Sequence, residues 1–217
     1  MALDLRLGGA DPPFWLGRLS LPPPQKHRQA IVDAAVRLFR QKGYAATGLN
    51  DVVAASGAPK GSVYHYFPGG KAEIGKAAVQ EAGRRVGETV RSLASSSRSA
   101  GELVRRHAEL LAGWMAQSDY RDGAPMTTVL LETAPWDAAI TSAGLEALGA
   151  WSGAITEKLI GDGIEASRAE RLASLTISSF EGALIQARVQ QSGSPLNIAA
   201  EELEQLFAIS SQMAGGV

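Results

Sequence analysis

Residues 54–67 read AASGAPKGSVYHYF, which places Tyr64, His65 and Tyr66 in consecutive positions shortly after the cation of Lys60. A helix turns by roughly 100° per residue, so the rings that close this segment cannot all face one core. Some of them must face outward. Phenol, imidazole and ammonium groups donate hydrogen bonds, and the ammonium group adds a positive charge. The chemistry to expect here is contact with phosphate oxygens or base edges.

A helix over residues 25–42 is predicted upstream of this segment. Its apolar residues recur with the i, i+3, i+4, i+7 and i+8 spacing of a surface helix. Gly43 follows and can supply the left-handed residue that ends a helix. We therefore expect this helix to support the segment that comes after it. Its apolar stripe consists of Ile31, Ala34, Ala35, Leu38 and Phe39.

Two short helices are predicted next, joined by a tight turn at Gly57. Thr47 is expected to cap the first of them, and the second covers residues 60–67. In that second helix Val63 and Phe67 are four residues apart and face the supporting helices. Such a pair forms a helix-turn-helix, whose second helix lies in the major groove of DNA. A three-helix packing module without a ligand is the alternative that spacing alone leaves open.

The distribution of charge favours a partner with phosphates. Residues 26–76 contain eight basic and three acidic side chains, a net charge of +5, whereas the whole chain carries −1. The remainder must therefore carry −6. A basic module joined to an acidic remainder is expected when only one part of a protein meets nucleic acid. A chance fluctuation of solvated charge is the alternative.

Composition sets further limits. The chain has 217 residues, 45% of them hydrophobic, and no apolar run approaches the ~20 residues of a membrane span. The absence of cysteine excludes disulfides, thiolate metal sites and a cysteine nucleophile, and it fits a cytoplasmic location. Residues 1–24 are rich in proline and lack the features of a secretory signal, so we expect a flexible N-terminal arm.

No constellation of catalytic groups stands out in the sequence. The three histidines, His27, His65 and His107, lie in different predicted helices. There is no Ser–His–Asp arrangement, no H-E-x-x-H motif and no glycine-rich phosphate loop. We therefore expect no catalytic residue, no metal site and no cofactor, and we expect that the protein is not an enzyme.

The segment GYAATGLNDVVAASGAPKGSVYHYFPGGKAEI resembles the DNA-binding signature of the TetR family of transcriptional regulators. Two later segments, DYRDGAPMTTVLLE and EGALIQARVQ, resemble the LmrA/YxaF-type branch of that family. The resemblance implies an all-helical homodimer whose recognition helix is residues 60–67. The positions it implies for contact with DNA are Thr47, Lys60, Gly61, Ser62, Tyr64, His65, Tyr66 and Lys71, although Tyr64 alternatively packs within the module.

The predicted organisation is an all-α chain of about nine helices. Residues 25–70 form the helix-turn-helix domain, and residues 71–217 form a helical domain for effector binding and dimerisation. A long helix over residues 71–93 links the two mechanically, because no Gly/Ser linker separates them. The S-x-x-E capping pattern appears at Ser99 and again at Ser167, which predicts two further helix starts.

Bulky residues of the second domain could line a ligand pocket between helices, which is usually apolar with a few placed polar groups. The resemblance makes a small hydrophobic or aromatic effector the expected ligand. Trp and Met at helical spacing also occur as plain core, and that alternative stays open. The candidate lining residues are His107, Trp114, Met115, Met126, Leu130, Trp151 and Ile155.

The last two predicted helices suggest a surface for a second copy of the chain. Small residues recur at a spacing of three or four, which lets another helix approach closely, and the resemblance implies a four-helix dimer interface. Packing within one protomer is the alternative. The candidate interface residues are Ser179, Phe180, Ala183, Gln186, Ala187, Leu203 and Phe207.

The function expected from these features is sequence-specific binding of double-stranded DNA. A homodimer would read a palindromic operator, because two recognition helices one DNA turn apart add their contacts. The resemblance implies a repressor that a small hydrophobic effector releases from DNA. An activator, or a regulator without a small-molecule effector, is the alternative.

Overall fold

The protein is helical throughout the part of the chain that the computed structural model describes, residues 23–214. This confirms the predicted all-α class and the expected number of helices. Most of the predicted N-terminal arm lies outside the described residues, and its last two positions already belong to the first helix. The described helices are α1 (Pro23–Lys42), α2 (Leu49–Ser56), α3 (Lys60–Tyr66), α4 (Gly70–Ser96), α5 (Ala100–Gln117), α6 (Pro125–Thr133), α7 (Ala138–Gly161), α8 (Ala166–Gln190) and α9 (Ser194–Ala214).

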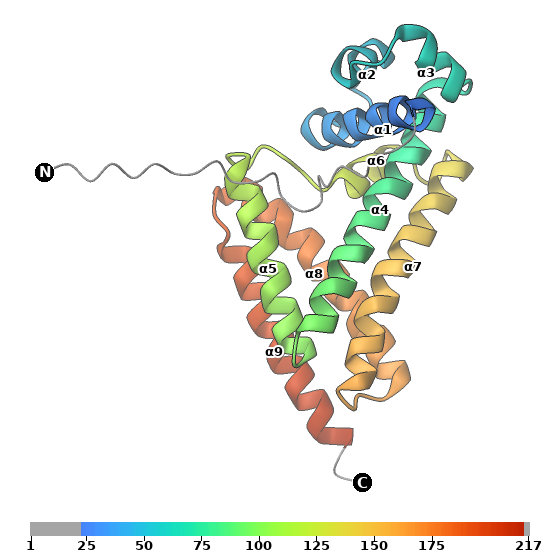
Figure 1. Ribbon diagram of the computed structural model, residues 1–217. Coiled ribbons are helices and arrows are strands. Elements are labelled where there is room, and N and C mark those ends of the chain that lie inside the picture. The colour runs from blue at the N-terminus through green and yellow to red at the C-terminus, as the bar shows by residue number, and fades with distance from the viewer. Residues whose placement is uncertain (1–22, 215–217) are drawn as a thin grey trace, which may run out of the picture.

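Helices α1, α2 and α3 form a module at one end of the molecule (Figure 1). The apolar stripe of α1 faces inward, and Ile31 and Phe39 are fully buried there. Gly43 and Gly57 adopt left-handed backbone, with φ of +86° and +63°, at the ends of α1 and α2. Glycine adopts this conformation without steric cost. The two glycine turns are therefore confirmed, and the module is a helix-turn-helix.

Helix α4 runs from this module into the second half of the molecule (Figure 1). It packs along α7 and also contacts α1 and α6. Its first residue is Gly70, so the predicted domain boundary at residues 70–71 falls in its first turn and stays a prediction. The apolar edge predicted for this helix is largely buried, including Ile74, Ala78, Ala82 and Val90.

The second half of the molecule packs α5, α8 and α9 together and against the pair formed by α4 and α7. Short helix α6 contacts α1, α4 and α7, so it lies where the helix-turn-helix module meets the second domain. None of the helices between residues 23 and 214 is long and apolar enough to cross a lipid bilayer. Large side chains that fill the core include Leu103, Ile140, Leu159, Leu172, Phe180 and Leu196.

Local capping decides where two of the later helices begin. The hydroxyl of Ser99 accepts the N–H of Glu102 at 3.1 Å, as the sequence pattern predicts for α5. The expected cap at Ser167 is wrong. Helix α8 begins two residues earlier than predicted, where the carboxylate of Glu165 accepts the N–H groups of Ser167 and Arg168 at 2.9 and 3.0 Å. The helix therefore starts with the carboxylate of Glu165 as its cap, and Ser167 lies inside its first turn.

The close crossing of α4 and α7 predicts opposite effects for two Gly→Ala substitutions. A β-carbon on Gly83 would lie 2.2 Å from Cβ of Ala147, whereas one on Gly149 would meet nothing within 4 Å. Gly83→Ala should lower the free energy of unfolding by about 1–3 kcal/mol through overpacking. Gly149→Ala, the matched control, should raise it by about 0.5–1 kcal/mol. Urea denaturation measures both, and stabilisation by Gly83→Ala would contradict the crossing.

Candidate nucleic-acid interface

Helix α3 presents one polar face to solvent and buries the other. Val63 and Phe67 are 0% and 1% exposed, which confirms the prediction that they face the supporting helices. Lys60 and His65 are exposed, and Tyr64 is 52% exposed. The structure therefore favours an outward Tyr64 over the alternative of packing within the module. A cation, an imidazole and a phenol thus share the outer surface of one short helix.

Ser62 and Tyr66 lie at the edge of this surface. Both are half-buried, and the ring of Tyr66 packs against the core. The rings of His65 and Tyr66 meet edge to face, with centroids 4.8 Å apart. Gly61, in the first turn, is exposed, and a β-carbon there would meet nothing within 4 Å. The backbone at this position is therefore open to close approach by a partner.

Thr47 does not lie where the sequence places it. Its side chain is fully buried, and its hydroxyl donates to the carbonyl of Gly43 at 2.7 Å. Gly48, not Thr47, precedes α2, and its N–H donates to the carboxylate of Asp51 at 2.9 Å. The expected cap at Thr47 is therefore wrong. Because its hydroxyl is turned into the loop, its side chain presents no exposed group to DNA.

Lys71 is held by the loop between α1 and α2. Its Nζ donates to the carbonyl of Ala45 at 3.2 Å and lies 4.4 Å from the ring centroid of Tyr44. A cation over an aromatic face is attracted by the ring quadrupole. Lys71 is half-buried, and a phosphate that contacted its ammonium would share it with the carbonyl of Ala45 and the ring of Tyr44.

Two other cations of the module also make internal contacts that the sequence does not reveal. The guanidinium of Arg28 lies 5.3 Å from the ring centroid of Phe67, and Arg37 donates to the carbonyl of Ala55 at 3.2 Å. These contacts fasten α1 to the other helices of the module. Lys42 and Lys60 are exposed and make no such contact in the described chain. They supply the more freely available positive charge.

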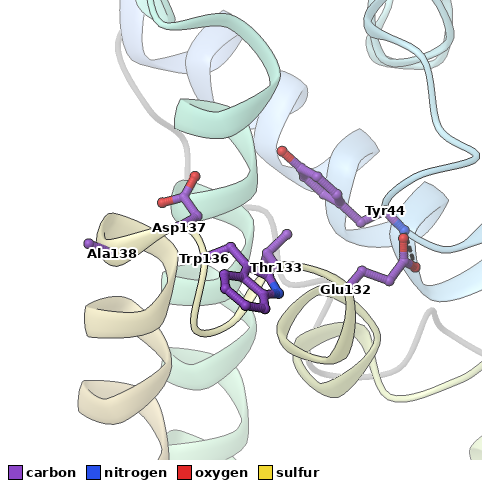
Figure 2. A pocket seen from close by; sticks show the side chains of 6 residues that line it. All are labelled: Tyr44, Glu132, Thr133, Trp136, Asp137 and Ala138. Carbon is purple, nitrogen blue, oxygen red and sulfur yellow. Dashed lines mark hydrogen bonds between the residues drawn. The ribbon is translucent and has the colours of Figure 1, made fainter.

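A shallow hollow of about 520 Å³ lies where the module meets α6 and α7 (Figure 2). The sequence does not predict it, because its walls come from segments far apart in the chain. Burial raises the pKa of Tyr44 above its usual value, and the negative charges of Asp137 and Glu132 raise it further. The residues that line the hollow are Tyr44, Glu132, Thr133, Trp136, Asp137 and Ala138.

The residues expected to line a ligand pocket belong to the core of the second domain. His107 lies edge-on to both Trp151 and Phe180, with ring centroids 6.0 and 5.0 Å away. The Nε1 atom of Trp151 is buried and has no hydrogen-bond partner among the described residues. The remaining candidates split into two groups: Met115, Met126 and Ile155 are buried, and Trp114 and Leu130 are partly buried.

Most of the expected interface residues point into their own protomer. Five of them, Phe180, Ala183, Ala187, Leu203 and Phe207, are between 0% and 4% exposed, so their side chains fill the core between helices. Gln186 is exposed and Ser179 half-buried. The stripe of α8 and α9 predicted to join protomers is therefore mostly buried within one protomer. The opposite stripe carries exposed apolar residues, namely Leu175, Ile185, Val189, Ile198 and Ile209.

The buried imidazole predicts a pH dependence of stability. Burial lowers the pKa of His107 from 6.5 to about 4. Between these values the unfolded chain binds a proton that the folded chain does not, so stability is lost as the pH falls. Titration of His107 therefore changes the free energy of unfolding by up to about 1.4 kcal/mol per pH unit in this range. His107→Leu should flatten the fall in the free energy of unfolding, measured in urea from pH 7 to pH 4.

The exposed His65 provides the control for that measurement. His65→Leu removes a histidine that is exposed on α3, so it shows how much of the change in slope comes from losing a histidine outside the core. Equal slopes for wild type and His107→Leu would mean that His107 titrates in the folded protein as it does in the unfolded chain.

Two segments of the chain match known families. Residues 31–78 match the bacterial regulatory proteins of the tetR family, and residues 100–202 match the C-terminal domain of LmrA/YxaF-like transcriptional regulators. An uncharacterised HTH-type transcriptional regulator of Mycobacterium tuberculosis is 32% identical over 188 residues, which covers 84% of this chain and 95% of the relative. The HTH-type transcriptional regulator LmrA of Bacillus subtilis is 30% identical over 169 residues, covering 78% and 90%.

Similarity extends to solved structures. A regulatory protein TetR from Rhodobacter sphaeroides superposes with a TM-score of 0.73 at 20% sequence identity, covering 82% of this chain and 97% of that one. This likeness shows a shared fold. Proteins of the matched families regulate transcription, which confirms the expectation that the chain is not an enzyme. The helix-turn-helix module, the helical second domain and these relatives place the chain in the TetR family of DNA-binding transcriptional regulators, in its LmrA/YxaF-like branch.

Proposed function

We propose that two copies of this chain bind a palindromic operator in the cytoplasm and repress the genes beside it. The observation that carries this proposal is the polarity of α3. Val63 and Phe67 anchor the helix to the module, and Lys60, Tyr64 and His65 are exposed to solvent. A short helix fixed in this way can lie in the major groove with its donors aimed at base edges and phosphates.

Dimerisation is supported by the outer faces of α8 and α9. Ile185 and Val189 on α8 are 62% and 79% exposed, and Ile198 and Ile209 on α9 are both 56% exposed. Gly182 lies about one turn before Ile185 on α8, and a β-carbon there would meet nothing within 4 Å. A backbone open at that point lets a partner helix approach closely. We propose that this face, rather than the stripe selected from sequence, joins the protomers.

An effector site is supported by the polar atoms in the core of the second domain. A buried indole N–H without an acceptor costs free energy, and Trp151 carries one beside the neutral imidazole of His107. We propose that a hydrophobic molecule with an acceptor atom enters here and separates the side chains. The effector then weakens operator binding, and operator DNA weakens effector binding by the same factor.

A regulator without a small-molecule effector is the second candidate. It is favoured by the packing of the same residues, because five of the seven expected lining residues are at most 4% exposed. Differential scanning fluorimetry against a panel of apolar aromatic compounds separates the two candidates. A compound that raises the melting temperature and is competed by operator DNA supports an effector, and the same shift should be lost in Trp151→Phe.

Operator binding is tested first by selecting bound duplexes from a random library. A palindromic consensus is the expected result. Lys60→Ala should weaken binding to that consensus and reduce the slope of log affinity against log salt by about 1, because one phosphate contact is lost. Tyr64→Ala should weaken binding without changing the slope. Fluorescence anisotropy over a range of salt concentrations measures both effects.

Arg98→Ala is the control for charge in that experiment. Its side chain is 90% exposed and lies in the connection between α4 and α5, at the far end of α4 from the module (Figure 1). Loss of this charge should leave affinity and salt slope near those of the wild type. Equal losses for Lys60→Ala and Arg98→Ala would mean that net charge, and not the surface of α3, determines binding.

The dimer interface predicts a charge-sensitive association. Ile185→Asp should weaken dimerisation at least about a hundredfold, because an unpaired charge buried in an interface costs about 3 kcal/mol or more. Leu145→Asp places the same charge on α7 at a residue that is 68% exposed, and it should leave the dimer intact. Sedimentation velocity at micromolar concentration distinguishes them. A dimeric Ile185→Asp protein would exclude this face.

A further inference from the structure

Glu132 connects the second domain to the loop that leads into the helix-turn-helix. It lies in the last turn of α6, and its two carboxylate oxygens accept the backbone N–H groups of Tyr44 and Ala45 at 2.9 and 2.5 Å. Figure 2 shows this carboxylate facing the backbone nitrogen of Tyr44. Hydrogen bonds to an ionised acceptor are stronger than those between neutral groups. One side chain therefore holds two successive peptide groups of a distant loop.

The loop is shaped to accept this carboxylate. Gly43 ends α1 with a φ of +86°, and a β-carbon there would lie 2.7 Å from Oε1 of Glu132. Any side chain at this position would both strain the backbone and displace the carboxylate. Glycine is therefore required by the approach of Glu132 as well as by the turn itself.

The same loop is also braced internally and tied to α4. The hydroxyl of Thr47 donates to the carbonyl of Gly43, and Lys71 donates to the carbonyl of Ala45. The loop thus gives two N–H groups to α6 and the carbonyl of Ala45 to α4, while the bond from Thr47 holds the loop's own shape. A displacement of α6 relative to α4 must strain one of these two sets of bonds.

The opposite face of α6 lies in the core. Met126 and Val129 are 3% and 0% exposed, and Leu130 packs so closely on α7 that a β-carbon on Gly144 would lie 2.5 Å from its Cδ2 atom. Just before α6, Asp122 pairs with Arg40 of α1 at 2.7 Å. Helix α6 is therefore fastened to the module near both ends and embedded in the second domain between them.

We propose that Glu132 is a positioning residue for DNA binding. By holding residues 44–45 it sets the orientation of α2 and α3 relative to the second domain, and it passes any movement of α6 to them. This inference rests on the proposed function, since orientation matters only when two recognition helices must meet two half-sites together.

The test compares full-length Glu132→Ala and Glu132→Gln with the wild type. Amide hydrogen exchange at Tyr44 and Ala45 should become about tenfold faster in Glu132→Ala, because both hydrogen bonds to the carboxylate are lost. Exchange at Val63 and Phe67 should stay slow. Affinity for the selected operator should fall about tenfold in the same variant at an unchanged melting temperature. Glu132→Gln keeps one acceptor oxygen and should fall between the two.

Glu146→Ala is the matched control, because Glu146 is an exposed glutamate on α7 that makes no hydrogen bond or ion pair with the described residues of the module. It should match the wild type in both measurements. Unchanged amide exchange at Tyr44 and Ala45 in Glu132→Ala would mean that the carboxylate of Glu132 does not hold this loop. Faster exchange with unchanged operator affinity would overturn the positioning role. Failure of the wild type to select any duplex would instead reject the proposed function. The exchange measurement would still show whether Glu132 holds the loop at Tyr44 and Ala45.

Discussion

Burial of Val63 and Phe67 is the contact on which the DNA-binding surface depends. Helix α3 has only seven residues, and a helix so short is not stable in water by its own hydrogen bonds. Its conformation and its rotation about its axis are therefore set by the two side chains that enter the core of the module. Because Val63 and Phe67 face inward, His65, which lies on the opposite side of the helix from both, must face outward, and Lys60 and Tyr64 are exposed beside it. The chemistry of the surface follows from apolar packing beneath it.

The cations of the module divide between structure and recognition. Arg28, Arg37 and Lys71 contact an aromatic ring or a backbone carbonyl within the protein. The net charge of +5 in residues 26–76 therefore overstates the charge that is free to meet phosphates. What remains is concentrated on fewer side chains, among them Lys42 and Lys60. The positive charge that is available to phosphates is therefore limited to the part of the surface that carries these side chains.

The helix-turn-helix was predictable from sequence because its determinants are local. Gly43 and Gly57 supply left-handed turns, and a four-residue spacing places Val63 and Phe67 on one face. The caps at Thr47 and Ser167 were wrong because α2 and α8 begin at other residues, Gly48 and Glu165 being the N-caps, and sequence alone does not rank neighbouring start positions. The residues of α8 predicted to join protomers include Phe180, which is fully buried in the core of its own protomer, because the most apolar stripe of a helix packs inward first.

The sequence by itself determined the all-α class, the helix-turn-helix and its family, because periodicity, turn residues and a contiguous motif act within a few residues of one another. Only the tertiary structure decided which stripe of α8 stays exposed, how His107 lies against Trp151, and that Glu132 meets a loop 87 residues away. These features depend on how long helices are rotated and placed against one another. An amphipathic pattern shows that a helix has a buried face, whereas packing alone determines which segments share it.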